Sequence, residues 1–114
     1  MQNETNNSPE KVFVITCRWN DRHGDDGLNT PVVRKTIEKA HESLIDSVTD
    51  YLNTHDVIDE DGKTILKENY CECSHDAKSL DDLVEQLKTA NGFSINMDGN
   101  GTWAEFDINE VEVE

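Results

Sequence analysis

The segment that most restricts the fold lies near the carboxyl end, where apolar and polar residues alternate on both sides of an Asn-Gly pair. Such a pair between two alternating runs is the strongest short signal for a β-hairpin. If Asn100-Gly101 forms a two-residue turn, every apolar residue of both arms falls on one face. The expected pairs are Met97 with Ala104, Ile95 with Phe106, and Phe93 with Ile108. We therefore expect a C-terminal hairpin with one apolar face.

The same segment contains fragments of a calcium-binding loop. Asn96 would be the first residue of that loop, Gly101 the sixth and Asp107 the twelfth, as in helix-loop-helix calcium sites. However, asparagine replaces the usual first aspartate, and Asp107 is shorter than the bidentate glutamate that closes such loops. The flanking residues alternate with period two, whereas a calcium loop needs helices on both sides. The hairpin is preferred, and calcium at residues 96–107 is kept as an alternative.

The rest of the chain alternates between strand and helix patterns. Residues 11–19 read as a central strand with apolar side chains on both faces. Residues 31–53 repeat apolar side chains every three or four positions, and Thr30-Pro31 supplies a helix start. Ser79 caps a second helix that Asn91-Gly92 would close. Between the helices, Asp61-Gly62 would reverse a short hairpin whose second arm could run to residue 74.

These segments define one domain. Residues 1–10 are polar and asparagine-rich, which predicts a disordered leader. Residues 11–114 are expected to form a single acidic α+β domain, with two helices on one face of a mixed sheet of about five strands that ends in the C-terminal hairpin. The 34% apolar content supports one modest core. The longest continuous apolar run, Val12 to Ile15, is far below the roughly 20 residues that span a membrane.

Cysteine usage indicates the cellular compartment and offers one weak metal motif. Three cysteines without a signal-peptide pattern indicate a cytoplasmic chain with reduced thiols. Cys71, Cys73 and His75 would point to one side of a strand and could begin a zinc site. One residue separates the two cysteines, whereas structural zinc sites usually have about two to four. Buried thiols are the preferred interpretation, no cofactor is expected, and an acidic domain with zinc at these three residues or calcium at 96–107 is the alternative.

Catalysis is not expected. The chain has no Gly-x-Ser-x-Gly, no glycine-rich phosphate loop and no His-Glu-x-x-His. The His55-Asp56 and His75-Asp76 pairs are neighbours in sequence, which is not the geometry of a catalytic triad. We therefore predict a binding protein rather than an enzyme.

The charge of the chain predicts the kind of partner. Twenty-five acidic and ten basic residues give a net charge of −15, whereas a magnitude of about 2–8 keeps a small domain soluble. A charge of this sign repels free nucleic acid and anionic membranes and attracts basic proteins. We expect a monomer that binds a basic nucleic-acid-binding protein, with no direct nucleic-acid or membrane contact.

The positions of the acidic residues strengthen this prediction. Glu38, Glu42, Asp46 and Asp50 recur at every fourth position of the long helix. Like charges at this spacing destabilise a helix, and the helix dipole disfavours negative charge near the carboxyl end. Local stability therefore does not explain the arrangement.

The final strand extends the acidic pattern. With Ala104 and Phe106 inward, Glu105 and Asp107 face outward, beside Trp103 as an apolar anchor. A one-residue bulge near Asn109 would turn the valines inward and the glutamates outward along the remainder of the strand. Those residues are Val111, Val113, Glu110, Glu112 and Glu114. The helix row and the strand row, side by side, could then approximate the phosphates of a DNA backbone.

These patterns predict an acidic protein-binding module, a DNA mimic that competes with nucleic acid for a basic DNA-binding protein such as a nucleoid histone-like protein or a nuclease. As a class it resembles the small DNA-mimic inhibitors of bacteria and phages, which share charge and shape rather than motifs. A solvated acidic surface with no partner is the simpler alternative. The predicted partner-binding residues are Asp46, Asp50, Asp59, Glu60, Asp61, Trp103, Glu105, Asp107, Glu110 and Glu112.

Overall fold

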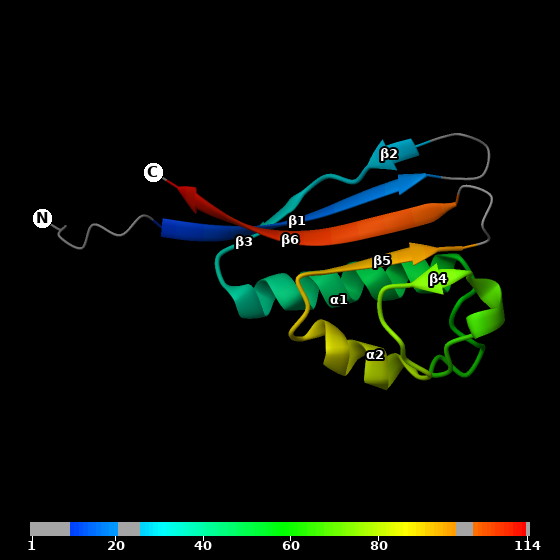
Figure 1. Ribbon diagram of the computed structural model, residues 1–114. Helices are drawn as coiled ribbons and strands as arrows, with labels where there is room; N and C mark the ends of the chain where they lie inside the picture. Colours follow the sequence, from blue (N-terminus) through cyan, green and yellow to red (C-terminus); the bar gives the residue numbers. More distant parts are fainter. Residues whose placement is uncertain (1–9, 21–25, 98–101, 114) are drawn as a thin grey trace, which may run out of the picture.

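Two helices lie on one face of an antiparallel sheet in the computed structural model, which describes residues 10–20, 26–97 and 102–113 (Figure 1). The α+β class and the placement of both helices on one face are confirmed. The sheet has six strands in the order β2-β1-β6-β5-β4, with β3 also paired to β1, and all described pairings are antiparallel rather than mixed. The elements are β1 Glu10–Asn20, β2 Asp26–Leu28, β3 Val32–Arg34, α1 Ile37–Thr54, the 3-10 helix η1 Lys67–Asn69, β4 Glu72–Cys73, α2 Leu80–Leu87, β5 Gly92–Asn96 and β6 Trp103–Val113.

The centre of the sheet is the pairing of β1 with β6. The two strands are paired along their whole lengths, from Glu10 opposite Val113 to Asn20 opposite Trp103. The register has no interruption, so the bulge expected near Asn109 is absent. Both strands run past the start of α1 toward the chain ends, and this part of the ribbon has no helix beneath it (Figure 1).

Helix α1 begins later than its apolar pattern predicts. Thr36 rather than Thr30 is the N-cap, and its hydroxyl accepts a hydrogen bond from the Lys39 backbone N–H at 3.2 Å. Val32 and the next two residues instead form β3 against β1. Adjacent valines favour a strand because their β-branched side chains pack well on a pleated sheet. The partner strand therefore overrides the helix signal at Pro31.

Helix α2 confirms the predicted cap but ends early. The Ser79 hydroxyl accepts from the Asp82 backbone N–H at 3.1 Å. The helix ends at Leu87, and Gly92 begins β5 instead of closing the helix. A Cβ atom at Gly92 would lie 2.5 Å from the Phe106 carbonyl oxygen. Glycine is needed there because the two backbones approach closely.

The turn after α1 is confirmed, but its arms are short. Gly62 has a φ of 71°, its N–H donates to the Asp59 carbonyl at 2.8 Å, and a single bridge joins Ile58 to Ile65. The second arm does not run to residue 74 because η1 interrupts it. Strand β4 pairs with β5 instead.

The C-terminal hairpin is confirmed, with a register two residues away from the predicted one. Phe93 pairs with Phe106 and Ile95 with Ala104. The Met97 N–H donates to the Thr102 carbonyl at 2.8 Å. Because side chains alternate with period two, this shift leaves the same residues on the apolar face. The Asn100-Gly101 turn lies outside the described residues.

The core lies between the sheet and the two helices. Leu44, Val48 and Leu52 of α1 and Leu87 of α2 are buried in the same apolar cluster as Phe106 of β6. Among the described residues, no helix has the length and apolar content that crossing a membrane would require.

Replacing Leu44 by alanine should lower the free energy of unfolding by about 2–5 kcal/mol, since the side chain is fully buried and its removal leaves a cavity. Urea denaturation of wild type and variant measures this difference. The matched control is Glu42→Ala, an exposed position on the same helix, which should change stability by less than about 0.5 kcal/mol. Equal effects of the two substitutions would contradict the described packing.

Candidate protein-binding surfaces

The unbroken β1–β6 register separates the acidic residues of β6 onto two faces. Glu105 and Asp107 point away from the helices, while Glu110 and Glu112 lie on the face of the sheet that carries α1. The predicted single outward row is therefore wrong. Strand β1 provides the reason: Val12 stands opposite Val111, and the Lys11 ammonium lies 3.3 Å from the Glu110 carboxylate. These cross-strand pairs favour the straight register over a bulge.

The helix row and the outward part of β6 are likewise on opposite sides of the sheet. Asp46 and Asp50 belong to α1, which covers the inner face, whereas Glu105 and Asp107 project from the outer face. The two rows do not lie side by side. The predicted set of partner-binding residues is thus divided between surfaces that one flat partner cannot contact together.

The acidic row of α1 is exposed along its whole length. Glu38, Glu42, Asp46 and Asp50 form no ion pair with any cation in the described part of the chain. The last turn of α1 contains no basic residue. The negative end of the helix dipole is therefore not offset locally, and this end of α1 attracts cations.

The acidic turn after α1 is only partly available to a partner. The carboxylate of Asp61 accepts hydrogen bonds from the backbone N–H groups of Lys63 and Thr64 and from the Thr64 hydroxyl. These bonds lower the pKa of Asp61 below its usual value. The Asp59 carboxylate accepts from the Glu60 backbone N–H at 2.7 Å. Two of the three predicted carboxylates therefore hold the turn together.

The outer face of the sheet is more apolar than acidic. The four most exposed large apolar side chains all project from it: Leu28 (62%), Val33 (59%), Val111 (43%) and Val113 (43%). Trp103 shares this face with Glu105, as predicted. Arg18 lies 5.8 Å above the Trp103 ring and 3.9 Å from the Glu105 carboxylate. The positive charge of Arg18 therefore offsets part of the acidity around Trp103.

The two candidate metal motifs gain no support. Among the described residues, no three His, Cys, Asp or Glu side chains gather as a metal site requires. Cys71 is exposed, Cys73 is half-buried beside Ile95, and the His75 ring stacks on Phe93. Strands β5 and β6 flank the calcium-like segment, so a helix-loop-helix site is ruled out there. Four positions of that segment, residues 98–101, lie outside the described residues.

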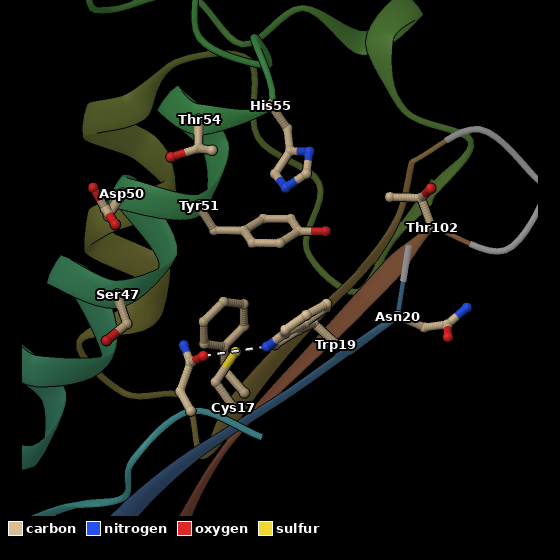
Figure 2. Close-up of a pocket in the computed structure, with 11 residues that line it drawn as sticks. Cys17, Trp19, Asn20, Ser47, Asp50, Tyr51, Thr54, His55 and Thr102 are labelled. Atoms are coloured by element: carbon tan, nitrogen blue, oxygen red, sulfur yellow. Dashed lines mark hydrogen bonds between the residues drawn. The ribbon is translucent and has the colours of Figure 1, made fainter. Parts of the chain in front are cut away.

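A cavity of about 340 Å³ opens between the second half of α1 and strand β1 (Figure 2). Trp19 and Cys17 line it from β1, and Asp50, Tyr51 and His55 line it from α1. Sequence patterns alone do not indicate this cavity. Its only local signal is the clustering of polar and aromatic residues in the last turns of the helix, because the two walls are about 30 positions apart in the chain.

Comparison with known proteins adds no family assignment. No protein-family model, curated protein or solved structure matches this chain significantly. The function is therefore argued from the acidic helix, the outer face and the cavity.

The three thiols should differ in reactivity. Burial raises the pKa of Cys17 to about 11, so that about one molecule in a thousand carries this thiolate at pH 8. We expect iodoacetamide at pH 8 to modify the exposed Cys71 first and Cys17 only after unfolding, as followed by peptide mass spectrometry. Labelling in 8 M urea is the control in which all three thiols react. Rapid modification of Cys17 in the native protein would contradict its burial.

Asp61 should stabilise the turn in a pH-dependent manner. Because its folded pKa lies below the unfolded value, its contribution is present above the unfolded pKa of about 3.9 and is lost as the pH falls through the folded pKa. The difference in melting temperature between wild type and Asp61→Asn should therefore shrink between pH 5 and pH 2. A difference independent of pH would show that the charge of Asp61 does not stabilise the turn.

Proposed function

We propose that this protein is an acidic, monomeric binding module of the cytoplasm that occupies the nucleic-acid-binding surface of a basic DNA-binding protein. The acidic row of α1 is the observation that carries the proposal. Its four carboxylates are exposed and lack ion pairs with the described cations, and their spacing works against the stability of the helix. A binding role accounts for an arrangement that the fold does not require.

The spacing of the carboxylates in the α1 row would match a partner surface that normally binds DNA phosphates. Four helical residues rise about 6 Å, and each strand of DNA presents a phosphate about every 3.4 Å along the axis. From Glu38 to Asp50 the row therefore follows roughly every second phosphate over about 18 Å. Carboxylates in this order would meet lysine and arginine side chains that normally contact DNA, and binding would weaken steeply as salt rises.

The most negative part of this surface is the carboxyl half of α1. Lys35 and Lys39 offset charge near the amino end, and the Arg34 guanidinium donates to the buried Ser43 hydroxyl at 2.8 Å. No lysine or arginine follows Lys39 within the helix. Asp46 and Asp50 are therefore the main contacts in the proposal.

The other predicted residues take different places in the proposed contact. Glu110 and Glu112 lie on the same face of the sheet as α1 and extend the acidic surface toward the chain ends. Trp103, Glu105 and Asp107 project from the opposite face. These three residues would contact the same partner only if that partner wraps around the edge of the sheet. Otherwise they would belong to a second, separate binding surface.

A variant that removes the α1 row tests the proposal. Glu38→Gln, Glu42→Gln, Asp46→Asn and Asp50→Asn together should weaken binding to a captured basic partner about 100-fold, since four charge contacts are lost at once. The matched control removes four exposed carboxylates outside the predicted partner-binding set: Glu68→Gln, Glu72→Gln, Asp81→Asn and Glu85→Gln. The partner is first captured from bacterial lysate at low salt, eluted with salt or duplex DNA, and identified by mass spectrometry.

Comparing the two variants shows whether binding depends on where the carboxylates lie or only on the net charge of the protein. A large loss in the α1 variant and a small loss in the control would support the DNA-like row. Equal losses would show that only net charge matters. Captured proteins that DNA does not displace, or an empty eluate, would contradict competition with nucleic acid and favour a solvated acidic surface.

A further inference from the structure

The cavity between α1 and β1 is open to solvent, with one wall on the sheet and the other on the helix. Trp19 forms the wall on the sheet side, and Tyr51 and His55 project from the helix on the other side (Figure 2). Its volume of about 340 Å³ is near the lower end of ligand clefts, which range over about 300–1,000 Å³. The site can therefore admit one long side chain or a small molecule.

The aromatic walls are held in place before any ligand arrives. The Trp19 indole N–H donates to the Asn29 side-chain oxygen at 3.2 Å. Gly27 lies beneath the ring, where a Cβ atom would come within 2.4 Å of it. The Tyr51 ring meets Phe106 edge to face at 5.8 Å between centroids and stands 4.2 Å from the His55 ring. Rings fixed in this way reduce the entropy that binding must overcome.

The electrostatics of the cavity favour a cation. Asp50 lies at its rim, exposed and without an ion pair to any described cation. The last turn of α1 also lines the cavity, and a helix carboxyl end carries a partial negative charge. Among the described residues that line the cavity, none is a lysine or an arginine. Aromatic faces add further attraction for a cation.

We propose that this cavity binds the guanidinium group of an arginine from the basic partner, with Trp19 and Tyr51 as stacking surfaces and Asp50 as the negative charge at the rim. Arginine fits better than lysine because its planar, weakly hydrated group can stack on an aromatic ring. This inference rests on the proposed function only in taking the partner to be a basic protein. It places one specific contact within an otherwise diffuse acidic surface.

The test uses Nα-acetyl-arginine amide as the probe and nuclear magnetic resonance of the two tryptophan indole N–H groups as the readout. The Trp19 signal should shift as the probe is added, with saturation in the millimolar range. The Trp103 signal should not, because Arg18 already lies above that ring. Trp103→Phe assigns the two signals, an equal concentration of sodium chloride controls for ionic strength, and Nα-acetyl-lysine amide is the comparison ligand.

Asp50→Asn and Asp46→Asn form a matched pair, since both remove one exposed carboxylate from α1 and only Asp50 lines the cavity. Asp50→Asn should weaken probe binding about three- to tenfold, and Asp46→Asn less than twofold. Equal effects, an unmoved Trp19 signal, or lysine binding as tightly as arginine would overturn the inference.

The DNA-mimic proposal and the cavity proposal can be rejected independently of each other. The probe experiment needs no protein partner, so a shift of Trp19 without DNA-displaceable capture would leave the cavity assignment standing and reject the DNA mimic. Capture that DNA reverses, with no shift of Trp19, would do the opposite.

Discussion

The full-length pairing of β1 with β6 is the constraint on which the rest of the structure depends. This pairing places Cys17 opposite Phe106 and joins the first strand of the described chain to the last. Strands β2 and β3 attach to the free edge of β1, and β5 with β4 to the free edge of β6. Helix α1 then covers the apolar side of both central strands. Because the register is unbroken, it also decides which acidic side chains of β6 share a face with α1.

The acidic surface and the small core act against each other. A net charge of −15 favours expansion through self-repulsion. The four ion pairs among the described residues are all exposed and offset little of that cost, since such pairs contribute about 0–1 kcal/mol each. The buried leucines and phenylalanines between helix and sheet therefore supply most of the stability. The basic partner proposed above would neutralise part of the charge on α1.

Local signals in the sequence predicted several elements well. The Ser79 cap was predicted because its hydrogen bond joins residues three apart. The hairpin of β5 and β6 and its apolar face were predicted because alternation is a property of neighbouring residues. The start of α1 and the register of the hairpin were missed. Val32 joins a strand that lies 17 positions away in sequence, which no local pattern indicates. Phe93 pairs with Phe106 rather than with Ile108, so the two-residue turn expected from Asn-Gly predicts the wrong register.

Local patterns in the sequence were enough for the α+β class, the apolar faces of the two helices and of the C-terminal hairpin, and the strongly negative charge, because period and composition are local or additive properties. Tertiary structure alone decided how the charges are shared between surfaces. Pairing with β1 turned Glu110 and Glu112 toward the helix face and left Glu105 and Asp107 on the other. The packing of α1 on the sheet placed Trp19 and Tyr51 on the walls of one cavity. Both outcomes depend on contacts between distant segments, which no local pattern in the chain encodes.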